Sequence, residues 1–64
     1  MIERLIVYSQ GRIILGSYPA SMLSEAQANA ARIERHTGLM AYVMTIWCKP
    51  TSIPKVGQSV DLYK

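Results

Sequence analysis

The sequence has one cysteine, one histidine and no phenylalanine among its 64 residues. The lone Cys48 excludes a disulfide within the chain and suits a reducing compartment, so we expect a cytoplasmic protein. An unpaired thiol of this kind packs most often as a small buried hydrophobic side chain. Because zinc sites need several His or Cys ligands at short spacing, the sequence predicts no metal and no other cofactor.

Long hydrophobic runs are also missing. Glu3, Arg4, Ser9 and Gln10 interrupt the apolar residues at the start of the chain. A signal peptide needs an apolar stretch of ~7–15 residues, and a membrane span needs ~20. The sequence therefore predicts no signal peptide and no membrane partner.

Catalytic motifs are absent as well. No glycine-rich phosphate loop and no nucleophile motif can be found in the chain. His36 has no partner in the sequence that would make it a general base, and a solvated histidine at a helix end is the expectation. We therefore predict that the protein is not an enzyme.

Three segments read as β-strands: residues 2–8, 12–17 and 40–48. Gly11 can take the positive φ that a two-residue hairpin turn requires, which makes Gln10 and Gly11 the predicted turn. This turn places Tyr8 opposite Ile13 and Val7 opposite Ile14. A shift of one residue would exchange the two faces.

One helix is expected over residues 25–37. Ser24 suits its N-cap and Gln27 the capping-box position, while Gly38 suits the left-handed residue after its last turn. A small apolar stripe faces the sheet, formed by Ala26, Ala30, Ile33 and Thr37. Such a narrow stripe can cover only one face of a sheet.

The third strand has two apolar faces, and we expect the larger set, Met40, Tyr42, Met44, Ile46 and Cys48, to meet the helix. Two prolines make residues 49–54 a loop, and residues 59–63 read as a short fourth strand. The prediction is a single α+β domain over residues 1–64. One mostly antiparallel sheet carries one helix on one face, in the order β-β-α-β-β.

Both sides of the predicted sheet are apolar, so a second copy or another molecule should cover the open one. Domains this short often need such support. We predict a homodimer or a bound host protein at an interface of Leu5, Val7, Arg12, Ile14, Val43, Thr45 and Trp47. Trp and Arg are enriched in binding hot spots, although Trp47 could equally be core.

The chain is mildly basic, with seven Lys and Arg against four Asp and Glu and a net charge of +3. A phosphate-contacting patch could be formed by Arg32, Arg35, His36, Lys49, Lys55 and Lys64. Scattered, solvated charge is the ordinary reading of such residues. Binding of nucleic acid by a basic dimer is therefore the alternative function.

In its small size and its strand-strand-helix-strand layout, the chain resembles small phage-encoded inhibitors of the anti-CRISPR type. The resemblance implies a non-enzymatic accessory protein of a phage or mobile element that inhibits a host protein by covering a functional surface. It rests on architecture and transfers no site residue.

Overall fold

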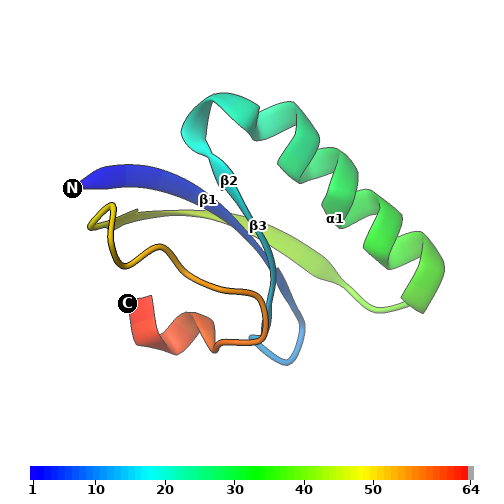
Figure 1. Ribbon diagram of the computed structural model, residues 1–64. Helices are drawn as coiled ribbons and strands as arrows, with labels where there is room; N and C mark the ends of the chain where they lie inside the picture. Colours follow the sequence, from blue (N-terminus) through cyan, green and yellow to red (C-terminus); the bar gives the residue numbers. More distant parts are fainter. Residues whose placement is uncertain (64) are drawn as a thin grey trace.

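The computed structural model describes residues 1–63 as one α-helix, three strands and two 3₁₀ turns. In chain order these are β1 (Ile2–Ser9), β2 (Ile14–Pro19), η1 (Ala20–Met22), α1 (Leu23–Thr37), β3 (Ala41–Cys48) and η2 (Val60–Tyr63). The strands form one antiparallel sheet in the order β2-β1-β3. Figure 1 shows three layers: α1 on one side of the sheet, the sheet itself, and the C-terminal segment on the other side.

The hairpin between β1 and β2 turns over one residue more than predicted. The N–H of Arg12 donates to the carbonyl of Ser9 (2.8 Å), and the N–H of Ser9 donates to the carbonyl of Ile13 (3.0 Å). Arg12 has the positive φ, 66°, and Gly11 does not. This pattern is a turn followed by a left-handed bulge residue, a common three-residue hairpin loop.

A second irregularity lies in β2. The pairing steps from Val7–Gly16 to Tyr8–Ile14, so Leu15 is an extra residue opposite β1. The longer hairpin loop places Tyr8 opposite Ile14, so the predicted register, with Val7 opposite Ile14, is wrong. Because side chains alternate between faces, the shift moves Ile14 to the side of the sheet away from α1.

The substitution Arg12→Gly removes two effects of opposite sign and similar size: the cost of a left-handed backbone and the gain from an ion pair. A left-handed conformation costs a non-glycine residue ~1 kcal/mol. The ion pair of Arg12 with Asp61 (2.8 Å) joins side chains that are 42% and 54% exposed, and such pairs contribute ~0.2–1 kcal/mol. We expect Arg12→Gly to change the free energy of unfolding by less than ~0.5 kcal/mol in urea titrations.

Arg12→Ala is the matched variant, because it loses the ion pair and keeps the backbone cost. It should be less stable than Arg12→Gly. Equal loss in both variants would show that the left-handed φ carries no cost at this position.

The helix begins two residues earlier than expected and ends where expected. The 3₁₀ turn η1 leads directly into α1, and Met22 is the N-cap residue without a side-chain capping bond. Ser24 therefore lies inside the first turn and does not cap the helix. The predicted end is confirmed: Gly38 is left-handed with φ 73°, and its N–H donates to the carbonyl of Glu34 (2.9 Å).

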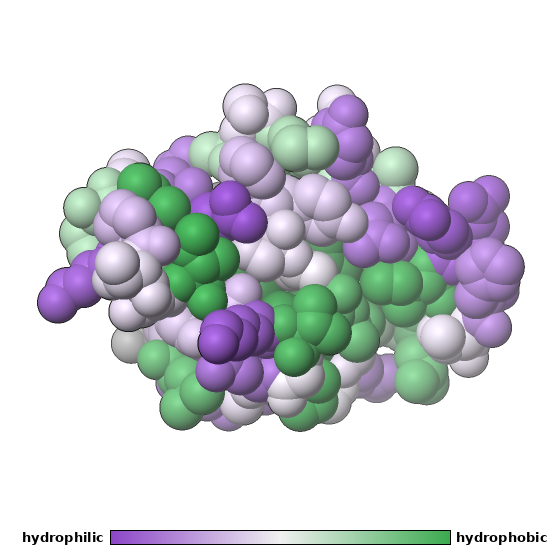
Figure 2. Space-filling model, in the orientation of Figure 1, coloured by the Kyte–Doolittle hydropathy of each residue, from purple (hydrophilic) through white to green (hydrophobic). Residues whose placement is uncertain are grey.

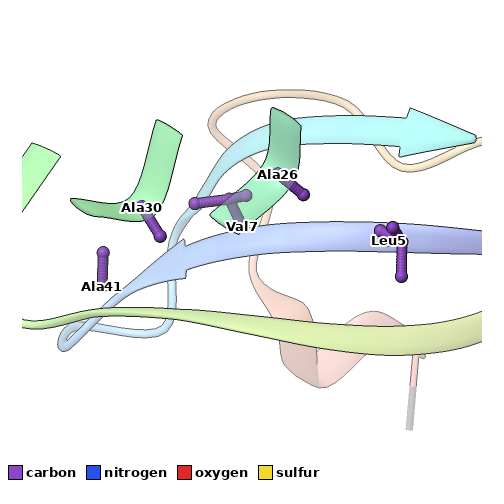
Figure 3. Close-up of a cluster of buried hydrophobic side chains, with 5 residues drawn as sticks. All are labelled: Leu5, Val7, Ala26, Ala30 and Ala41. Atoms are coloured by element: carbon purple, nitrogen blue, oxygen red, sulfur yellow. The ribbon is translucent and has the colours of Figure 1, made fainter. Parts of the chain in front are cut away.

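Small residues let α1 approach the sheet closely. Ala26 and Ala30 are buried, and Figure 3 shows the side chain of Val7 of β1 between them. The cluster is completed by Leu5 and Ala41, with Leu15, Tyr18, Ile33 and Val43 at its margin. Gly16 is part of this close fit, because a Cβ there would lie 3.3 Å from the Asn29 side chain of α1.

The face of β3 that meets the helix is the smaller one, against expectation. Ala41 and Val43 pack below α1, whereas Met44, Ile46 and Cys48 belong to the cluster on the opposite side. Cys48 is a free, buried cysteine, as predicted.

The second face of the sheet is covered by the chain itself. Val60 is 1% exposed and packs with Ile6, Ile14 and Ile46. Ile53 and Tyr63 extend this cluster. The expected open face is therefore wrong. So is the last strand, because residues 60–63 form η2 and only Ser59 makes a single bridge, to Ile13. The order is β-β-α-β.

Hydrogen bonds attach the C-terminal segment to β2. Ile14 donates to the carbonyl of Gln58 (2.8 Å) and accepts from Gly57 (2.9 Å). The side-chain oxygen of Gln58 accepts from the Tyr63 hydroxyl (2.6 Å) and from the N–H of Lys55 (3.0 Å). These bonds hold the segment against the sheet although it adds no strand.

Candidate protein-binding edge

Strand β3 has one neighbour, β1, and its other edge is unpaired within residues 1–63. Its eight residues, Ala41–Cys48, contain no charge, no proline and no bulge. The outer strand on the other side differs: β2 carries a bulge at Leu15, ends at Pro19 and is bonded to Gly57 and Gln58. Bulges, prolines and covering segments protect a sheet edge from other chains. Only β3 lacks such protection among the described strands.

The backbone groups that face the free edge follow from strand geometry. The N–H of Ser9 points toward β2, because it donates to Ile13. Backbone groups of alternate residues in a strand point to opposite edges, so Val7 also points toward β2 and its neighbour Val43 points away from β1. The same alternation gives outward N–H and C=O groups at Ala41, Val43, Thr45 and Trp47.

The side chains of the second half of β3 are uncovered on the helix side. Trp47 is 62% exposed, and Thr45 is also exposed. Both lie on the same face as Val43, which the helix half-covers. An exposed tryptophan beside an open strand edge is unusual for a free surface, because a large aromatic ring is normally buried.

A shallow hollow lies along the exposed surface of α1. It is lined by Gln27, Ala28, Ala30, Ala31, Glu34 and Arg35. Asn29 approaches Gly16 of β2, so helical periodicity places Gln27, Ala31 and Glu34 on the other flank, toward β3. Because alanine side chains are short, this flank of the helix has room for a bulky side chain.

On the side shown in Figure 2, hydrophobic residues gather in the middle of the molecule below the helix. Large apolar side chains are exposed on β3, on the loop before it and on the C-terminal segment, and also at the N-terminus, in the hairpin loop and at the start of α1. They are Met1, Ile13, Leu23, Leu39, Met40, Tyr42, Trp47, Val56 and Leu62.

The structure separates the residues predicted for an interface. Leu5 and Val7 lie below α1, and Ile14 lies below the C-terminal segment, each at most 5% exposed. These three cannot form an accessible surface in the folded chain. Arg12 pairs with Asp61. Val43, Thr45 and Trp47 remain together on β3, and they stay candidates.

The basic residues do not form one patch. Arg32, Arg35 and His36 lie on α1, while Lys55 belongs to the segment on the opposite side of the sheet and Lys49 follows β3. Lys64 lies outside the described residues.

Within residues 1–63, no three His, Cys, Asp or Glu side chains are grouped in a way that could hold a metal ion. His36 is exposed in the last turn of α1. No helix in the same range is long and apolar enough to cross a membrane.

Sequence reasoning missed the hollow on α1 and the open edge of β3. The signals were present as the alanine-rich run 28–31 and as an uncharged strand without proline. Comparisons with protein families, with curated proteins and with solved structures found no match.

Proposed function

We propose that the chain is a non-enzymatic protein-binding module and that it binds a strand of another polypeptide along β3. The observation that carries this proposal is the unpaired, uncharged edge of β3 beside the exposed Trp47. Addition of a strand to a sheet edge gives affinity through main-chain hydrogen bonds and selectivity through alternate side chains.

Two kinds of favourable interaction are available at this edge. Each backbone hydrogen bond contributes ~0.5–1.5 kcal/mol net. Four residues offer outward groups, and a buried tryptophan can act as a hot spot of at least ~2 kcal/mol. Association itself costs several kcal/mol, so a strand that pairs with the edge but leaves Trp47 in water would bind weakly.

For the biological role, we propose that binding inhibits a host protein by covering a functional surface, as an accessory protein of a phage or mobile element does. The small size of the domain and its layout support this role. Nucleic-acid binding has less support, because the basic residues that would carry it lie in different layers of the molecule.

The test removes one backbone donor from the free edge. Thr45→Pro deletes an N–H that points away from β1, so the bonds within the sheet stay intact, as for natural prolines on edge strands. Thr45→Ala is the matched control, because it shortens the same side chain and keeps the N–H. With immobilised protein and host lysate, we expect proteins identified by mass spectrometry on the wild type and on Thr45→Ala to be lost on Thr45→Pro.

Retention of the same proteins by Thr45→Pro would overturn binding along β3. Circular dichroism should show that both variants are folded. Steep loss of all binding as salt rises, together with retention by Thr45→Pro, would favour the nucleic-acid alternative.

A further inference from the structure

We infer that a second copy of this chain supplies the strand, so that two β3 strands pair antiparallel about a two-fold axis at Thr45. This inference rests on the proposed function and describes the same edge in the free protein, where a host strand that binds along β3 has to displace the second copy. It joins two sheets into one of six strands in the order β2-β1-β3-β3-β1-β2, with both helices on the same side.

No charged side chain on β3 opposes the pairing of two copies. An edge that carries several lysines or glutamates would repel a second copy, and proteins use that device to remain monomeric. The segment Ala41–Cys48 has no charged side chain. A net charge of +3 over the whole chain is small and is not concentrated on this strand.

Backbone geometry restricts the register. Outward-pointing groups must face one another in an antiparallel ladder, so residues of odd number pair with residues of odd number. Centring the axis on Thr45 pairs Thr45 with itself and Trp47 with the second copy's Val43. Thr–Thr and aromatic–β-branched pairs are the cross-strand neighbours that stabilise sheets, by ~0.2–1 kcal/mol each.

The same register gives Trp47 a place to pack. Val43 packs at the margin of the buried cluster that contains Ala30, and Ala30 also lines the hollow on α1 together with Ala28 and Ala31. A Trp47 ring opposite the second copy's Val43 stands beside that copy's hollow, with Arg35 at its rim. The two-fold axis makes the contact twice. The exposed Trp47 of one copy and the hollow on α1 of the other are thus complementary.

The opposite face of the paired strands is apolar as well. Met44 would adjoin the second copy's Ile46, and Tyr42 would adjoin the second copy's Cys48. Tyr42 is 37% exposed in the monomer and contacts Tyr8, with ring centroids 5.3 Å apart. Cys48 would lie well away from the second copy's Cys48, so the dimer requires no disulfide.

Sedimentation velocity over a concentration series tests the dimer. We expect wild type and Thr45→Ala to dimerise and Thr45→Pro to remain a monomer. Trp47→Ala and Ala31→Glu should each raise the dissociation constant by at least about tenfold while the circular dichroism spectrum is unchanged. Trp47 is the single tryptophan, so its emission should shift to shorter wavelength as the concentration rises.

Mild oxidation tests the register. Thr45→Cys should form a disulfide-linked dimer readily, because residues opposite each other on paired strands have Cα atoms ~5.5 Å apart, within disulfide range. Thr51→Cys, in the exposed loop after β3, is the control and should stay largely monomeric. Equal crosslinking of both variants would refute the Thr45 axis.

The outcomes separate the inference from the proposed function. A wild-type monomer at all concentrations, together with host proteins that are lost on Thr45→Pro, would overturn the second copy and leave strand binding intact. A dimer unaffected by Thr45→Pro would overturn pairing through β3.

Discussion

Val60→Asp should leave the protein unfolded or close to unfolded at room temperature. Val60 is 1% exposed, and it packs on Ile6, Ile14 and Ile46 at the centre of the C-terminal layer. A carboxylate at that point would be buried without a partner, at a cost of several kcal/mol. A domain of this length has a total stability of only about 3–10 kcal/mol, from ~0.05–0.15 kcal/mol per residue.

Leu62→Asp is the matched control, since it introduces the same charge in the same 3₁₀ turn at a side chain that is 68% exposed. It should change the urea midpoint little. Val60→Ala should fall between the two, with a loss of ~2 kcal/mol from two missing methyl groups and the cavity they leave. If Val60→Asp and Leu62→Asp unfolded at the same urea concentration, the C-terminal segment would not pack on the sheet.

The C-terminal layer is the part of the fold that the sequence did not reveal. Its contacts come from Ile53, Val60 and Tyr63, which are separated by Pro54 and Gly57 and do not belong to one helix or strand. Periodicity detects regular elements only. A segment held by bonds from Gly57 and Gln58 to Ile14 covers a sheet face without being one continuous helix or strand, so the sheet appeared to be open.

Unlike the C-terminal layer, the end of the helix could be predicted from the sequence, because Gly38 meets a local requirement for a left-handed residue. The start of the helix could not, because η1 precedes α1 without a break and makes the capping signal of Ser24 irrelevant. Local chemistry fixes a helix end only where no neighbouring element intervenes.

The predicted pairing of β1 with β2 was wrong because of the conformation of one residue, Arg12. Arg12 adopts the positive φ although its neighbour is Gly11. The side chain of Arg12 pairs with Asp61, which is 49 positions away in the sequence. A contact between residues so far apart in the sequence is not visible in the local turn pattern, which favours glycine at the positive φ. Because the predicted hairpin loop was one residue too short, Ile14 was assigned to the wrong face of the sheet and was included in the predicted interface.

The candidate site was predicted in part. Thr45 and Trp47 were named from the strand pattern, and the structure leaves both exposed. Their role was assigned to an open sheet face, whereas the unpaired feature is the strand edge. Which edge of a sheet is free depends on strand order, and strand order cannot be obtained from the pattern of one strand.

Ala26→Leu should cause the second large loss of stability, because α1 lies close to the sheet only where its side chains are small. Ala26 is fully buried above Leu5 and Val7 (Figure 3). Three added carbons have no space there, and overpacking of this kind costs ~1–3 kcal/mol or more. On a total of about 3–10 kcal/mol, this is a large fraction.

Ala28→Leu makes the same substitution at an exposed position two residues along the helix, and the two residue types have similar helix propensity. We expect its unfolding free energy to stay within ~0.5 kcal/mol of the wild type, whereas Ala26→Leu falls well below it in thermal and urea unfolding. Equal stability of the two variants would mean that α1 can move away from β1 at no cost. In that case the close fit at Ala26, and the hollow beside it that is proposed to receive Trp47, would not be fixed features of the domain.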